Sequence, residues 1–137
     1  MSTDTDPQDP AEPTGRRERG QEMMNAVYGW SIDPTKPFEV QTVDHLFGDV
    51  WADGDLSVRD RRLVLIGLVV GSGQTDVAGL QVDAALRLGE LEPDDVRYLV
   101  TFLAHYAGWP RAAALNSEVE KIIARHEKSR AVETDDS

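Results

Sequence analysis

Three arginines that stand close together in the sequence are candidates for binding an acidic substrate. Arg59, Arg61 and Arg62 each carry a planar guanidinium, which can hold a carboxylate through two parallel hydrogen bonds. Surface ion pairs with Asp55 and Asp60 would explain the same residues, since surface arginines usually contribute little. The cluster precedes a strongly apolar stretch, which supports a cleft, and the sequence leaves both interpretations open.

One glutamine interrupts an apolar helix stripe. Gln81 stands among the small and apolar residues Val77, Leu80, Ala84 and Ala85. At helical spacing its amide should therefore face inward, where it needs hydrogen-bond partners. Neighbouring backbone groups can supply them, or Gln81 can line a pocket and orient a substrate carbonyl or a water molecule.

A histidine and a tyrosine close a predicted helix. The negative end of the helix dipole near His105 and Tyr106 favours imidazolium, which would make a proton available near neutral pH. A histidine in that place also commonly caps the last carbonyls of its helix. His45 and His126 give no metal-ligand spacing with another candidate, so no metal site is expected.

Large aromatic residues are candidates for a pocket wall. Trp51, Tyr106 and Trp109 could together line a substrate pocket. Buried aromatics are otherwise ordinary core residues, and the sequence leaves both interpretations open.

These side chains must be positioned by helices. Glycine and proline positions divide the chain into about six helices, which predicts an all-α fold. The helices are expected near residues 16–28, 38–51, 57–70, 75–88, 93–107 and 110–126, with glycine stops at Gly71 and Gly89. Pro93 with its acidic neighbours is a strong helix start.

The apolar pattern predicts which faces are buried. The helix over 57–70 is apolar all round between Leu63 and Val70 and should be central. One stripe is expected in the second helix at Val43, Leu46, Phe47 and Val50, and one in the fourth at Val77, Leu80, Ala84 and Leu88. The fifth helix has two adjoining apolar faces and should be enclosed on both sides. One face carries Val96, Leu99, Val100 and Leu103, and the other carries Tyr98, Phe102 and Tyr106. The last helix carries a stripe suited to docking or to a partner subunit, at Leu115, Val119, Ile122 and Ile123.

An alternative for residues 63–73 is a buried strand that leads into a dinucleotide-binding loop. The third glycine of that motif is missing, and Asp76 would repel a pyrophosphate at the helix N-terminus. No other convincing strand is available to pair with it, so the helix is preferred.

Composition limits the function. The 137 residues carry a net charge of -11, which argues against nucleic acid and anionic membranes as partners, and no stretch is long enough for a membrane span. Residues 1–15 and 127–137 are polar and charged and are expected to be disordered tails around one domain over 16–126. The first residues have no apolar signal-peptide core, so a cytoplasmic location is expected.

Three segments, taken in order, resemble a known family. GDVW at 48–51 followed by LSVRDRRL at 56–63 is similar to the entry into that family's central helix. QVDAAL at 81–86 is similar to its site helix, and YAGWPRA at 106–112 to its helix junction. Together they resemble the carboxymuconolactone decarboxylase family, which also contains the alkyl hydroperoxidase D-like proteins, over roughly residues 18–126.

The resemblance implies an all-helical subunit that assembles as a homotrimer or homohexamer with sites near subunit contacts. The family's peroxidase branch uses a Cys-x-x-Cys pair near Thr75, and this chain has no cysteine, which excludes thiol peroxidase activity. The decarboxylase branch has a histidine where this sequence has Gln81, and an amide cannot deliver a proton. His105, Tyr106 or a bound water would have to supply it.

Three functions follow as hypotheses. The first is a cofactor-independent lyase for a small anionic lactone or enolisable acid, in which an arginine holds a carboxylate and Gln81 donates a hydrogen bond to the enolate. The second is a non-catalytic helical binding module that kept the fold and lost the chemistry. The third is an isomerase or hydratase that uses the same enolate stabilisation without loss of carbon dioxide.

Overall fold

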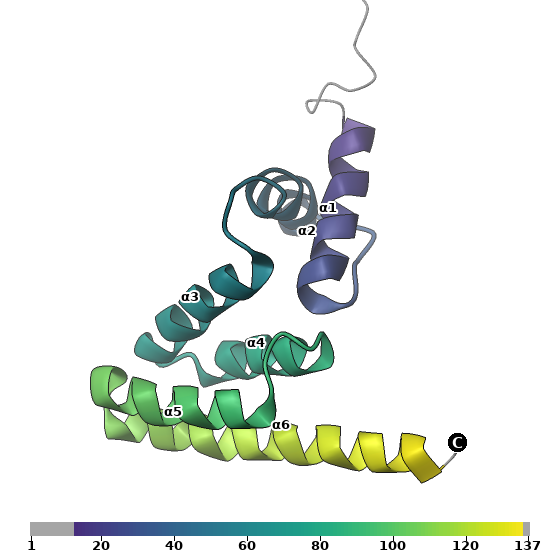
Figure 1. Ribbon diagram of the computed structural model, residues 1–137. Helices are drawn as coiled ribbons and strands as arrows, with labels where there is room; N and C mark the ends of the chain where they lie inside the picture. The colour runs from purple at the N-terminus through teal and green to yellow at the C-terminus, as the bar shows by residue number, and fades with distance from the viewer. Residues whose placement is uncertain (1–12, 136–137) are drawn as a thin grey trace, which may run out of the picture. The chain divides into compact units, whose positions relative to one another are not determined.

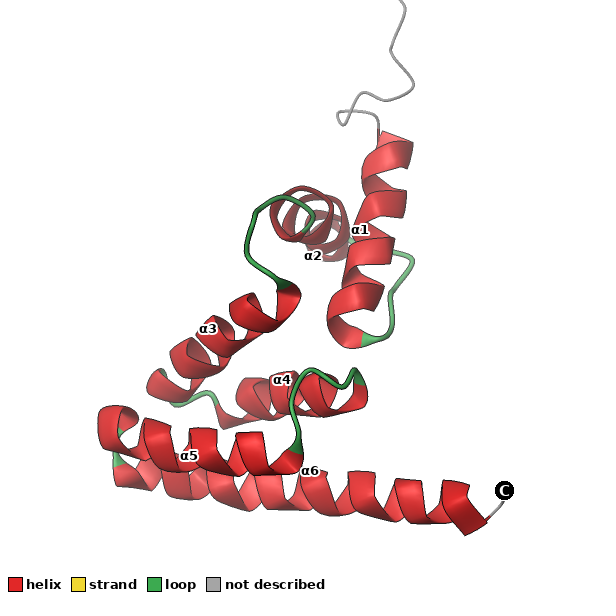
Figure 2. Ribbon diagram, viewed as in Figure 1, coloured by secondary structure: helices red, strands yellow, loops and turns green. Residues whose placement is uncertain are grey.

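Helices are the only regular elements in the computed structural model, which describes residues 13–135 (Figure 1). The expected all-α class is therefore confirmed over that range (Figure 2). Contacts divide the chain into two compact units, the first ending at Val58 and the second beginning at Arg59. None of the described helices is both long enough and apolar enough to cross a bilayer.

The first unit contains α1 (Pro13–Tyr28), the short α2 (Pro37–Val40) and the π-helix η1 (Gln41–Trp51). α1 packs against η1, and two glycines bring their backbones together. A Cβ on Gly20 would lie 1.9 Å from the carbonyl oxygen of Val43, and one on Gly48 would lie 2.8 Å from that of Arg16. The crossing therefore requires glycine at both places.

The π-helix corrects the expected α-helix over 38–51. Val43, Phe47 and Trp51 are buried, whereas the predicted stripe residues Leu46 and Val50 are exposed. The buried residues recur at every fourth position, and hydrogen bonds to the fifth residue back give a wider turn that keeps such positions on one face. A prediction based on α-helical spacing therefore places Leu46 and Val50 on the buried face, whereas the π-helix turns them outward.

Arginine–aspartate pairs join the same two helices. Arg16 donates to Asp49 at 2.6 and 3.3 Å, and Arg17 donates to Asp44 at 3.1 and 3.0 Å. The hydrogen bonds from Arg16 and then His45 lower the pKa of Asp49 to about 2. Charge pairing thus adds to the glycine-mediated contact.

The second unit contains α3 (Val58–Gly71), α4 (Thr75–Arg87), α5 (Pro93–Ala107) and α6 (Trp109–Asp135). α6 packs against both α4 and α5, and Figure 1 shows α5 and α6 side by side. The stripe predicted on the last helix, Leu115, Val119, Ile122 and Ile123, is buried in the core of this unit. That stripe therefore docks within the chain and is not left for a partner subunit.

α3 ends at Gly71, one residue past the predicted end at Val70, and the glycine that terminates it lies two residues later than predicted. The left-handed glycine is Gly73, with a φ of 76°, and not Gly71. The N–H of Gln74 donates to the carbonyl of Val69 at 2.8 Å, and that of Gly73 donates to the carbonyl of Val70 at 3.0 Å. This pair of hydrogen bonds is a Schellman termination, which needs glycine at its left-handed position.

Several expected core faces are exposed. On α3, Val64 and Leu68 are exposed, so this helix is not enclosed all round within the unit. On α4, Val77, Leu80 and Leu88 are exposed, and the buried face is formed by small residues and valine: Ala78, Gly79, Val82 and Ala85. Small residues let α6 approach α4 closely, because a Cβ on Gly79 would already lie 3.1 Å from Glu118. The bulky residues consequently turn outward.

The first and the last helix both extend beyond their predicted limits. α1 begins at Pro13, and α6 continues to Asp135, past the expected end at His126. Helix thus covers residues 13–15 and 127–135 of the tails that the sequence predicts to be disordered. The latter segment is charged but contains no glycine or proline and is rich in strong helix formers. The remaining tail positions, 1–12 and 136–137, lie outside the described residues.

Candidate functional site

The most buried charge in the second unit is that of Arg62 on α3, whose side chain is 1% exposed. Its Nε and one terminal nitrogen donate to the two carboxylate oxygens of Glu90 at 2.6 and 3.1 Å. Its other terminal nitrogen donates to Oε1 of Gln81 at 2.9 Å. We call Arg62, Gln81 and Glu90 the Arg62 network.

A glycine turn places Glu90 against the arginine. Gly89 has a φ of 72°, which favours glycine, and its N–H donates to the carbonyl of Leu86 at 3.3 Å. The N–H of Glu90 donates to the carbonyl of Ala85 at 2.9 Å, so the chain reverses immediately after α4. The predicted glycine stop is thus confirmed, and it fixes the backbone of the residue that pairs with Arg62.

Glu90 itself was missed by sequence reasoning. The sequence contains one signal for it: an acidic residue that directly follows a helix-ending glycine, in a chain that also has an arginine cluster. That signal is weak, because most acids in such loops are solvated and only the fold brings α3 to this turn.

Gln81 faces inward as predicted and is 3% exposed. Its carbonyl oxygen accepts the hydrogen bond from Arg62, and this contact fixes the orientation of the amide. The amide nitrogen carries two donor hydrogens. The Arg62 network therefore places a positive charge beside an oriented amide at a buried position, where electrostatic interactions are strong.

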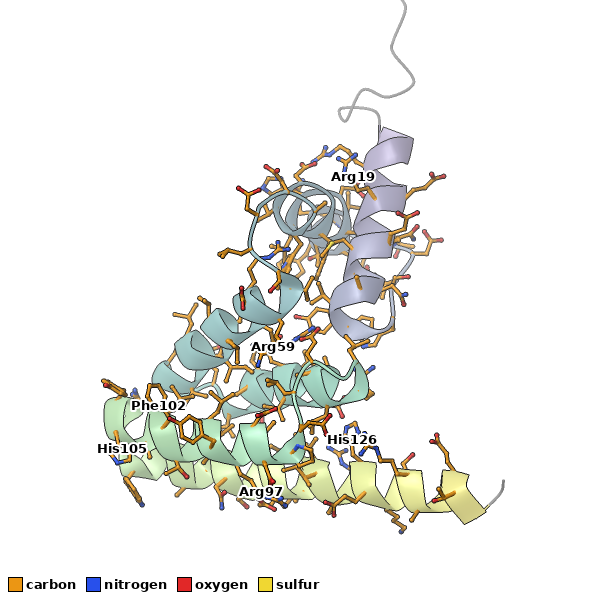
Figure 3. All side chains as sticks on the ribbon, in the orientation of Figure 1. Arg19, Arg59, Arg97, Phe102, His105 and His126 are labelled. Carbon is orange, nitrogen blue, oxygen red and sulfur yellow. The ribbon has the colours of Figure 1, made fainter. Side chains whose placement is uncertain are left out.

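The other two arginines occupy more open positions. Arg59 is exposed and donates through Nε to the main-chain oxygen of Glu90 at 3.1 Å (Figure 3). Arg61 is half-buried on the same helix. The structure therefore brings Arg59 and Arg62 to the same residue, one at its main chain and one at its carboxylate.

The predicted site residues at the end of α5 are on the surface. His105 is exposed, and its Nδ1 lies 2.8 Å from the carbonyl oxygen of Thr101, which lies one turn back within α5 and is not one of the last carbonyls of the helix. The Trp109 ring meets the His105 ring edge-on at a centroid distance of 5.6 Å. Tyr106 is exposed and contacts the ring of Phe102. These contacts join the residues to one another and not to the Arg62 network.

Trp51, the remaining predicted site residue, lies at the end of η1 in the first unit. It is buried and stacks on Phe47 with a centroid distance of 6.2 Å and an interplanar angle of 13°. This burial and stacking identify Trp51 as a residue of the local core and not of a pocket wall.

A cavity of about 340 Å³ lies between the end of α4 and the second half of α6, around His126. The imidazole Nε2 lies 2.9 Å from Oδ1 of Asp83. Burial raises the pKa of Asp83, but hydrogen bonds from His126 and Arg87 outweigh it, and the net pKa is lowered. Two arginines and three glutamates line the cavity, and Gln81 does not.

Comparison with protein-family models matches residues 38–121 to the carboxymuconolactone decarboxylase family. The matched segment contains all three residues of the Arg62 network and the sequence segments that carry the resemblance. Neither the curated proteins nor the solved structures yield a match.

Proposed function

This chain belongs to the carboxymuconolactone decarboxylase family, and from that premise we propose that it is a cofactor-independent lyase for a small anionic lactone or related enolisable acid. The observation that carries the proposal is the Arg62 network, in which a buried cation orients the amide of Gln81. Loss of carbon dioxide from a lactone acid leaves a dienolate, which requires stabilisation at oxygen and a proton at carbon.

The proposed step assigns one role to each group. The bond between the substrate and its carboxylate carbon breaks, carbon dioxide leaves, and the electron pair moves onto the lactone carbonyl as a dienolate. The amide nitrogen of Gln81 donates a hydrogen bond to that oxygen, and the charge of Arg62 stabilises it. Arg59 and Arg61 hold a second carboxylate of the substrate, since the two-pronged face of Arg62 binds Glu90.

The proton for carbon is assigned to a water molecule. His105 and Tyr106 were the other candidates, and they are exposed and contact Thr101, Phe102 and Trp109. Water therefore gives up the proton to the dienolate carbon, and the hydroxide left behind is neutralised by solvent.

A direct test incubates the purified protein with carboxymuconolactone and a panel of related lactone acids and measures release of carbon dioxide. We expect turnover by the unaltered chain and a loss of about 10²–10³-fold in Gln81→Ala, the usual effect of removing one enolate donor. Gln74→Ala is the matched control, because Gln74 is exposed at the start of α4 and its side chain caps nothing. No turnover of any lactone by folded protein would argue against the proposal.

A second candidate, a helical binding module without catalysis, is favoured by one observation. The three hydrogen bonds of Arg62 described above all end on residues of its own chain, which is also how a structural ion pair is built. Such a module would bind a lactone acid in calorimetry and leave it chemically unchanged. An isomerase or hydratase would instead exchange substrate protons with deuterated water without releasing carbon dioxide.

The oligomeric state is a further part of the proposal. The family resemblance implies homotrimers or homohexamers with sites near subunit contacts. Light scattering of the purified protein measures this directly, because one chain weighs 15.1 kDa.

A further inference from the structure

An aromatic ladder runs along the outer side of α5. The rings of Tyr98 and Phe102 stack at a centroid distance of 6.0 Å, and those of Phe102 and Tyr106 lie 5.3 Å apart. Beyond the end of α5, Trp109 continues the surface through its contact with His105. We call Tyr98, Phe102, Tyr106 and Trp109 the aromatic face. Figure 3 shows Phe102 and His105 projecting from α5.

Tyr98, Phe102 and Tyr106 were expected to be enclosed, but the described residues of the second unit leave the aromatic face uncovered. Tyr98, Phe102, Tyr106 and Trp109 are 67%, 45%, 79% and 65% exposed. With about 200 Å² for each aromatic side chain, they present roughly 500 Å² of mostly apolar surface. Two such surfaces joined together would bury about 1,000 Å², which is the lower limit for a specific interface.

The order of the aromatics matches a two-fold arrangement of two copies. Tyr98 and Tyr106 lie on either side of Phe102 at equal spacing, so the ladder reads the same in both directions along the helix. A two-fold axis at Phe102 places Tyr98 of one copy on the partner's Tyr106, and the reverse contact follows from symmetry. A surface that is self-complementary in this way suits a second copy of the same chain.

Charges at the ends of α5 favour the same antiparallel arrangement. The N-terminal end carries Asp94 and Asp95, of which Asp94 pairs with Arg97, whereas the C-terminal end carries His105 and is followed by Arg111. An antiparallel pair sets the acidic end of each helix beside the basic end of the other, and the two helix dipoles also oppose each other favourably. A parallel pair would instead bring the acidic ends together.

We propose that two copies of this chain associate through the aromatic face, with their α5 helices antiparallel about a two-fold axis at Phe102. The interface goes beyond the proposed lyase activity and does not depend on it. It predicts an even number of subunits, since a homohexamer contains two-fold axes and a homotrimer does not.

The first experiment compares the masses of three proteins by size exclusion with light scattering. The unaltered chain should have an even multiple of 15.1 kDa, and Phe102→Glu should have half that number of subunits. Val132→Glu is the control, because Val132 is also an exposed apolar residue of a helix in the same unit, outside the aromatic face, and it should leave the mass unchanged. Circular dichroism verifies that each variant is folded.

Several outcomes of this comparison would overturn the proposal. They are a monomeric unaltered chain at all concentrations, an odd number of subunits, and a folded Phe102→Glu variant whose mass is unchanged. Each is measured without substrate, so failure here is separate from failure of the lactone assay.

The second experiment determines the direction of the helices and uses the absence of native cysteine. Single variants Tyr98→Cys and Tyr106→Cys are oxidised alone and as a mixture. In the antiparallel pair, identical positions are about 12 Å apart along the axis, beyond the reach of a disulfide of about 7 Å, whereas Tyr98→Cys meets the partner's Tyr106→Cys. We expect a cross-linked dimer from the mixture only, and cross-linking of either variant alone with none in the mixture would contradict the proposal.

Discussion

Arg62 shows what a buried charge requires of its neighbours. Removing a guanidinium from water costs several kcal/mol, and the cost is offset only when opposite charge and hydrogen-bond acceptors are held in good geometry. Glu90 supplies both oxygens to the arginine and Gln81 supplies a third acceptor. The residues that make the charge tolerable are also those that orient the amide, so stability and the proposed chemistry depend on the same contacts.

Two arginine–glutamate pairs in this chain provide a matched comparison of stability. Arg62→Ala should lower the free energy of unfolding by about 3–5 kcal/mol, because it leaves Glu90 and Gln81 without their partner. Arg97→Ala should cost much less, since Arg97 and Glu120 form a similar two-pronged pair in an exposed position, where solvent screens the charges. Urea unfolding of both variants measures the difference, and equal costs would contradict this account of the Arg62 network.

The acid stability of the first unit should depend on Asp49. Its pKa of about 2 in the folded protein lies below the ordinary value of 3.8, so its ion pairs stabilise the fold fully above that ordinary value. This contribution is lost as the pH falls from about 4 towards 2 and the carboxylate is protonated. Melting temperatures across this range should fall less steeply for Asp49→Asn than for the unaltered chain. Parallel curves would show that Asp49 does not contribute.

At the scale of helices, glycines decide where elements meet and where they end. Gly20 and Gly48 allow α1 and η1 to touch through their backbones, and Gly89 turns the chain so that Glu90 reaches Arg62. In both cases the absence of a side chain determines the geometry.

Two substitutions in α1 separate the packing role of glycine from its helix propensity. Gly20→Ala should destabilise the first unit by at least about 1–3 kcal/mol, because the new methyl group would overlap the Val43 carbonyl. Gly15→Ala should be neutral or stabilising by up to about 1 kcal/mol, since nothing lies within 4 Å of that position. Thermal unfolding followed by circular dichroism compares them. Equal melting temperatures would mean that the α1–η1 contact is not close.

The sequence predicted the helices better than the faces they bury. The α5 bounds and the Gly89 stop follow from local signals, Pro93 at one end and a left-handed glycine at the other, and both are confirmed. The inward orientation of Gln81 is also confirmed. The exposure of the aromatic face was not predictable, because an apolar stripe has the same sequence pattern whether it is covered by its own chain or not. Glu90 was missed because its partner lies on a different helix.

At the scale of the whole chain, the family segment is shorter than the helical region. The match covers residues 38–121, and α6 continues well beyond it. The last α6 residue in the buried core cluster is Ile123, and the described residues from Glu127 on are exposed. The second half of α6 therefore adds a surface, including one wall of the His126 cavity, beyond the last residue of the buried core.

This division predicts that the end of α6 is dispensable for folding. A chain that stops after Glu127 should retain the helical spectrum of the remaining residues and unfold within a few degrees of the full chain, because no core residue is removed. Circular dichroism with thermal unfolding tests this. A large drop in melting temperature would show that the exposed part of α6 contributes to the stability of the second unit.

The central claim is that the amide donor of Gln81, oriented by Arg62, stabilises an enolate. The most direct measurement is the carbon dioxide release rate of Gln81→Glu, which keeps an acceptor for Arg62 and removes the amide donor. We expect a folded protein whose rate is lower by about 10²-fold or more. A folded Gln81→Glu variant that turns over lactone at the rate of the unaltered chain would contradict the account.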